Sequence, residues 1–113
     1  MKTSLEFLNK TEKNVVTSFV KELKKKVGDD IIAIRLFGSK VRGDFEKDSD
    51  IDIFVLVKRK EETRDKISDI AADYVYEYNV PLAPVIYSVF EYEKNRELGS
   101  FFFEQVEREG VSL

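Results

Sequence analysis

The sequence predicts an α/β fold, with a small mixed β-sheet flanked by helices. Two short runs, Ile31–Phe37 and Ile51–Val57, are rich in β-branched and large apolar residues, which is typical of buried strands. Segments 11–27 and 61–78 instead repeat apolar residues at helical spacing, which is typical of amphipathic helices. With 113 residues and no repeat, linker or low-complexity tract, residues 1–113 are expected to form one domain.

Each expected helix has one apolar face. The first helix should end at Gly28. Its apolar face comprises Val15, Val16, Phe19, Val20, Leu23 and Val27. The inward residues of the second helix are Ile67, Ile70, Ala71, Tyr74 and Tyr78.

The last third of the chain contains one more strand and two further helices. Pro81 and Pro84 place the strand 82–89 at a strand start or a sheet edge, because proline cannot donate to a β-ladder. A short helix is expected through 91–95, beginning near Ser88, and another over 98–108.

Three consecutive phenylalanines, 101–103, lie in the last expected helix. Consecutive helical residues span about 200° of the circumference, so one face cannot easily bury all three. Either two enter the core while one stays partly exposed, or the run forms a surface for self-association or for a partner.

The end of the first strand resembles a phosphate-binding turn. Gly38 allows close approach of the backbone to a ligand, and the first N–H groups of a following helical turn have no intrahelical partners. Ser39 adds a hydroxyl at the same place.

The start of the second strand carries a pair of carboxylates. Strict alternation places Asp50 and Asp52 on one face and Ile51 and Ile53 on the other. The two Cα atoms should lie roughly 6–7 Å apart. From there both carboxylates can converge on Mg²⁺, which prefers oxygen ligands and would relieve their repulsion.

These residues carry a family resemblance. Gly38-Ser39, Arg42-Gly43 and Ser49-Asp50-Ile51-Asp52 resemble the signature of the nucleotidyltransferase superfamily to which DNA polymerase beta belongs. The chain is similar over nearly its whole length to the minimal, single-domain members. The resemblance therefore implies a nucleotidyltransferase fold.

The resemblance also implies roles for particular residues. Gly38 and Ser39 would hold the triphosphate of a nucleotide such as ATP, and Arg42 would hold the loop or contact phosphate. Asp50 and Asp52 would be catalytic ligands for Mg²⁺ ions that bridge the triphosphate. The implied activity is transfer of a nucleoside monophosphate to a hydroxyl acceptor.

One expected element of that catalytic pattern is missing. Active members carry a third carboxylate on a later strand, where it activates the attacking hydroxyl. Here that strand should be 82–89, and it contains no acid. Glu77 or Glu91 from a strand end, or a partner subunit, remain open as sources.

The resemblance also allows an alternative function of a different class. Minimal nucleotidyltransferases are often paired with small helical HEPN proteins in toxin–antitoxin modules. This chain would then be an antitoxin-like interaction module that binds nucleotide with little turnover.

Composition excludes several other kinds of chemistry. The chain has no His and no Cys, which removes zinc sites, disulfides, and His- or Cys-based catalysis. An EF-hand fails because Ile53 and Arg59 stand where glycine and glutamate belong, and no Walker A or dinucleotide-binding motif is present.

Charge and hydropathy limit the expected partners and location. A net charge of −3 argues against a broad nucleic-acid surface, and the lysines at 21, 24, 25 and 26 are expected to be the solvated face of a helix. No signal peptide or apolar span of membrane length is seen, so a cytoplasmic location is expected.

Overall fold

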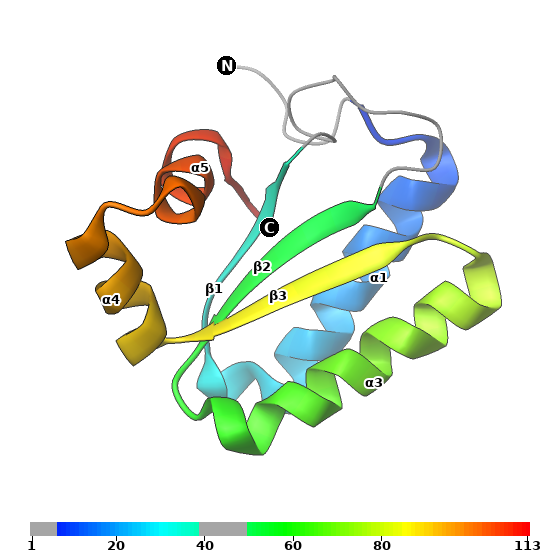
Figure 1. The fold of residues 1–113 in the computed structure, drawn as a ribbon. Helices are drawn as coiled ribbons and strands as arrows, with labels where there is room; N and C mark the ends of the chain where they lie inside the picture. The colour runs from blue at the N-terminus through cyan, green and yellow to red at the C-terminus, as the bar shows by residue number, and fades with distance from the viewer. Residues whose placement is uncertain (1–6, 39–49) are drawn as a thin grey trace.

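The computed structural model describes residues 7–38 and 50–113. Four strands and four α-helices, with one 3₁₀ turn, follow each other along these ranges (Figure 1). The elements are α1 (Lys10–Val27), η1 (Gly28–Asp30), β1 (Ile31–Phe37), β2 (Ile51–Val57), α3 (Lys60–Tyr78), β3 (Leu82–Ser88), α4 (Val89–Leu98), α5 (Phe101–Glu109) and β4 (Val111–Ser112). The expected α/β class is confirmed.

The strands form one mixed sheet in the order β3-β2-β1-β4. β1 pairs antiparallel with β2 and with β4, whereas β2 and β3 run parallel. Parallel neighbours need a crossover, and α3 supplies it. β3 is an edge strand, as Pro81 and Pro84 predict.

The two faces of the sheet are covered by different helices. α1 and α3 lie on one face, and α4 and α5 lie on the other (Figure 1). Side chains alternate along β2, so Ile51, Ile53, Val55 and Val57 pack into the core under α1 and α3. The residues between them, Asp52, Phe54 and Leu56, therefore face α4 and α5.

The core under α1 and α3 contains most of the buried apolar residues. The whole predicted apolar face of α1 is buried there, with Phe19 and Leu23 completely inaccessible. Asn9 caps this helix, because its side chain accepts from the Glu12 N–H while Glu12 returns a bond to the Asn9 N–H. The lysines near the end of α1 are exposed, as expected.

The opposite face holds an aromatic cluster. Phe54 contacts Tyr87, Tyr92 and Phe102, and Phe37 meets Phe102 edge-on at 5.5 Å. The cluster attaches α4 and α5 to the sheet. Gly38 follows the clustered Phe37, and Asp52 lies two residues before the clustered Phe54.

The largest boundary differences from the sequence predictions lie between α4 and α5, and β3 ends at Ser88, one residue before its predicted end. α4 extends to Leu98, and α5 begins only at Phe101, because Gly99 adopts a left-handed conformation with φ +61° and Ser100 caps α5. The single helix predicted over 98–108 is therefore wrong at its start. Phe102 and Phe103 are partly buried and Phe101 is 79% exposed, close to the arrangement of two inward and one outward.

The prediction that Tyr78 faces inward is wrong, because its side chain is 48% exposed. It stacks on Tyr74 with ring centroids 6.0 Å apart. The helix ends there, with Asn79 left-handed, so the apolar face does not continue over the core.

Alkaline destabilisation is expected from Tyr74. Burial, together with donation of its hydroxyl to Glu22 at 2.8 Å, raises the pKa of Tyr74 from 10.0 to about 12. A raised folded-state pKa stabilises fully below pH 10 and is lost as pH rises from 10 toward 12. Between pH 10 and 12, the free energy of unfolding of Tyr74→Phe should fall less than that of the wild type. The expected difference is on the order of 1–2 kcal/mol. Urea unfolding at several pH values measures this. The same loss of unfolding free energy in both proteins would contradict the prediction.

Within the described residues, no helix is both long and apolar enough to cross a bilayer.

Candidate functional site

Gly38 ends β1 in a conformation that suits glycine. Its φ is +84°, in the left-handed region. An added Cβ would lie 2.4 Å from Oδ2 of Asp52, far inside van der Waals contact. Phe37 pairs with Asp52 across the β1–β2 ladder, which brings the turn onto this carboxylate. The Gly38 backbone therefore forms a wall of the space around Asp52.

The two predicted carboxylates lie at the start of β2. Asp50 directly precedes the strand and is exposed, whereas Asp52 is its second residue and is partly buried. Ile51 and Ile53 are fully buried on the α1–α3 face, so Asp52 points to the opposite face. The predicted separation of apolar and acidic faces is found at Asp52.

The neighbouring strand presents no acid beside Asp52. In the parallel β2–β3 ladder, Asp52 pairs with Ala83 and Phe54 pairs with Val85. Residues paired in this way lie on the same face, with strands about 4.8 Å apart. Ala83 thus occupies the position on β3 closest to Asp52. Across the described ranges, no group of three potential metal-binding side chains is found.

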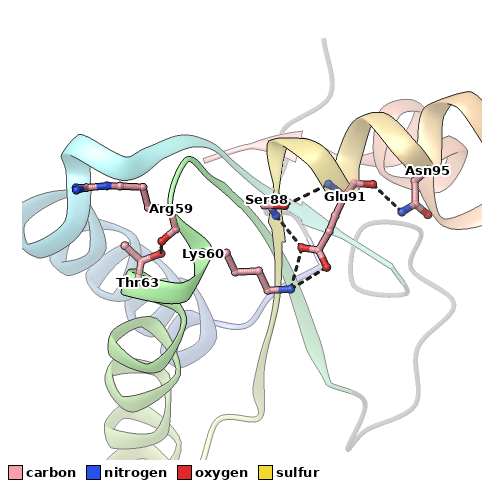
Figure 2. Close-up of polar contacts among 6 residues, drawn as sticks. All are labelled: Arg59, Lys60, Thr63, Ser88, Glu91 and Asn95. Atoms are coloured by element: carbon pink, nitrogen blue, oxygen red, sulfur yellow. Dashed lines mark hydrogen bonds and ion pairs between the residues drawn. The ribbon is translucent and has the colours of Figure 1, made fainter.

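Glu91, one suggested source of a third carboxylate, lies at the wrong end of the sheet. Figure 2 shows its carboxylate bonded to Lys60 Nζ at 2.9 and 3.1 Å and accepting from the Ser88 N–H at 2.9 Å. Ser88 pairs with Val57, the last residue of β2, whereas Asp52 lies near the first. Five residues of strand, roughly 17 Å, separate the two places.

Glu91 has a structural role where it lies. Its backbone N–H bonds to Ser88 Oγ, which completes a capping box at the start of α4, and Asn95 donates to its carbonyl. These Ser88 bonds and the Lys60 ammonium hold the pKa of Glu91 below its usual value. Figure 2 also shows Thr63 bonded to the Arg59 carbonyl at the start of α3.

Glu77, the other suggested source, lies on the last turns of α3 and is exposed. α3 covers the face of the sheet opposite to Asp52. Glu77 therefore lies on the other face of the sheet from Asp52, whereas Glu91 lies at the other end of the sheet.

Ser39 and Arg42, the other predicted nucleotide-binding residues, lie outside the described residues, as do the acids at 44, 46 and 48. The position missed by reading the sequence is Ala83. Its importance comes from the register of β3 on β2, which no local pattern in the sequence reveals.

The described residues fit a hard divalent cation. Asp50 and Asp52 supply carboxylate oxygens at the border of the sheet, the ligand type that Mg²⁺ prefers. The absent Cβ at Gly38 lets the Asp52 carboxylate lie directly against the backbone of the turn. Such a site can bind the phosphates of a nucleotide through a shared cation.

Comparison with known proteins identifies the family of this chain. Residues 16–109 match the family model described as nucleotidyltransferase domain. Two curated relatives from Methanocaldococcus jannaschii are named "Putative protein adenylyltransferase MJ0141" and "Putative protein adenylyltransferase MJ0604". They are 30% and 33% identical to this chain, covering 88% and 90% of it and 95% and 97% of their own lengths. MJ1305, with the same description and organism, is 34% identical over 65% of this chain but only 52% of its own length.

Two solved structures share the fold. One, titled "Structure of putative minimal nucleotidyltransferase", has a TM-score of 0.57 at 23% identity and covers 89% of this chain and 94% of its own. The other, titled "Crystal structure of the toxin-antitoxin with AMP-PNP", has a TM-score of 0.55 at 21% identity and covers 84% and 69%.

Proposed function

Because this chain belongs to the nucleotidyltransferase family, we propose that it transfers a nucleoside monophosphate, most simply AMP, from a triphosphate to a protein hydroxyl. The observation that carries the proposal is the convergence of Asp52 and the left-handed Gly38 turn at one end of the sheet. The relatives' description as protein adenylyltransferases supports ATP as donor and a protein as acceptor.

The proposed site divides its work among five residues. Asp50 and Asp52 hold Mg²⁺ and act as the catalytic carboxylates. Gly38 lets the triphosphate approach the strand end, and Ser39 and Arg42 bind phosphate. The roles of Ser39 and Arg42 depend on the sequence motif alone.

The reaction is an in-line displacement at the α-phosphorus. The acceptor oxygen bonds to the α-phosphorus and loses its proton to solvent. The bond from that phosphorus to the bridging oxygen breaks, and pyrophosphate leaves with its electrons. Bound Mg²⁺ supplies charge neutralisation and orientation of the phosphates. Asp50 and Asp52 would hold the ion, and the Gly38 turn would limit where the triphosphate can lie.

The first experiment is an incubation of the purified chain with Mg²⁺ and each of ATP, CTP, GTP and UTP, with and without the protein encoded beside it. Intact mass should show one added nucleotide on an acceptor. We expect Asp50→Ala/Asp52→Ala to lower transfer by at least about 10³-fold, because both cation ligands are lost. If that variant still transferred nucleotide at the wild-type rate, Asp50 and Asp52 would not be the catalytic residues.

A second candidate is an antitoxin-like module that binds nucleotide and a HEPN-type partner with little turnover. Two observations favour this candidate. The face of β3 beside Asp52 carries Ala83 and Val85 and no acid, and the chain shares its fold with the toxin–antitoxin structure. The outer side of α4 and the start of α5 expose Phe90, Leu98 and Phe101, a surface suited to such a partner or to a homodimer. Nucleotide binding and partner binding without transfer would favour this candidate.

The proposal covers residues 1–113 acting as one nucleotidyltransferase domain. It also includes the cytoplasmic location, since that compartment supplies nucleoside triphosphates.

A further inference from the structure

The missing strand acid restricts which hydroxyl the site can use. A general base beside the acceptor usually contributes about 10²–10⁴-fold. On the Asp52 face of β3, the nearest residues are Ala83 and Val85, and neither has an ionisable side chain. A tyrosine phenol normally ionises near pH 10, whereas an aliphatic hydroxyl does not ionise in the accessible range. A site whose described strand face carries no base therefore favours a phenol as acceptor.

The chain has five tyrosines, and the structure separates one from the others. Tyr87 and Tyr92 belong to the aromatic cluster under α4 and α5. Tyr74 is packed against the core and bonded to Glu22, and Tyr78 stacks on Tyr74. Tyr76 is 93% exposed and makes no hydrogen bond or ring contact in the described ranges.

The surroundings of Tyr76 form a surface on which another molecule can rest. A shallow groove of about 580 Å³ runs between α3 and the edge strand β3, beside Tyr76. Ser68, Ala72 and Val75 line it from α3, and Leu82 and Pro84 from β3. The Tyr76 phenol is therefore accessible beside a groove of small and apolar residues.

Tyr76 and the site of the same chain lie on different sides of the sheet. α3 covers the face that carries Ile51 and Ile53, whereas Asp52 faces α4 and α5. The sheet lies between Tyr76 and Asp52, and the exposed Tyr76 side chain faces away from it. Modification of Tyr76 therefore requires the site of a second copy.

We propose that Tyr76 is an acceptor for nucleotide transfer between copies of this chain, so that one copy adenylylates another. The inference rests on the proposed function. The Tyr76 phenol oxygen bonds to the α-phosphorus of ATP, the bond from that phosphorus to the bridging oxygen breaks, and pyrophosphate leaves with its electrons. The phenol proton passes to solvent.

Mixing two complementary variants tests this directly. Asp50→Ala/Asp52→Ala keeps Tyr76 but lacks the carboxylates, and Tyr76→Phe keeps the carboxylates but lacks the acceptor. Each variant alone with Mg-ATP should stay unlabelled. Together, AMP should appear only on the Asp50→Ala/Asp52→Ala chain, at Tyr76 by peptide mapping, with a rate per chain that rises with protein concentration.

Tyr78→Phe is the matched control, because Tyr78 lies on the same helical end but stacks on Tyr74. It should label like the wild type. AMP on another residue, or an unlabelled mixture, overturns the inference.

The protein encoded beside the chain and a free tyrosine peptide serve as independent acceptors in the same assay. Transfer to either of them without labelling of Tyr76 overturns this inference and leaves the proposed function standing. No transfer to any acceptor overturns both.

Discussion

Gly38→Ala is expected to lower nucleotide transfer by at least about 10²-fold while the chain still folds. The new Cβ would lie 2.4 Å from Oδ2 of Asp52, so the carboxylate must rotate away. Displacement of a catalytic group by about 1 Å can cost that factor. Alanine at φ +84° also costs stability, roughly 1–3 kcal/mol. Single-turnover transfer rates and urea unfolding measure the two effects separately.

Gly99→Ala is the control that separates crowding from backbone strain. Gly99 is also left-handed, with φ +61°, but nothing lies within 4 Å of its added Cβ. It should lose comparable stability and keep the wild-type transfer rate. If both variants lose transfer equally, strain and not the position of Asp52 is the cause.

The strands β1 and β2 could be predicted to the residue because their signals are local. Ile31–Phe37 and Ile51–Val57 are short apolar runs bounded by polar or glycine residues. The helices α1 and α3 each begin one residue earlier than predicted, and both end where predicted. The start of α1 is set by the Asn9 cap.

The α4–α5 region could not be divided correctly from its sequence. Phe90, Leu98 and Phe101 are exposed, so the apolar pattern there does not follow a buried face. The break is made by Gly99 and Ser100, and a glycine within a helical pattern does not by itself fix a helix end.

The candidate site was predictable only in part. Alternation alone indicates that Asp52 and its apolar neighbours face opposite ways. The contact between Gly38 and Asp52, and the position of Ala83 beside Asp52, depend on strand pairing between distant segments. Pairing order and register are tertiary properties, so no spacing in the sequence could supply them.

Ala83→Asp is expected to increase transfer, by up to about 10²–10⁴-fold. Ala83 is the register partner of Asp52 in the parallel ladder and shares its face. A carboxylate there would project from a strand about 4.8 Å from β2, on the same face as Asp52, where it can take the proton of the acceptor hydroxyl. Ala83 is partly exposed, so the fold should accommodate the new side chain. Transfer rates at saturating Mg-ATP measure the gain.

Ala83→Asn provides the matched control, because it has nearly the same shape but cannot accept a proton as a carboxylate does. It should transfer no faster than the wild type. Equal rates for all three proteins, with Mg-ATP binding intact, would show that the absent base is not what limits turnover.

The gain should also depend on the acceptor. A base assists a poorly acidic hydroxyl more than a phenol, which already ionises more readily. Ala83→Asp should therefore raise transfer to serine or threonine peptides more than transfer to tyrosine peptides. A uniform gain would mean that the new carboxylate acts by binding another cation, and that the preference for a phenol has a different origin from the missing strand acid.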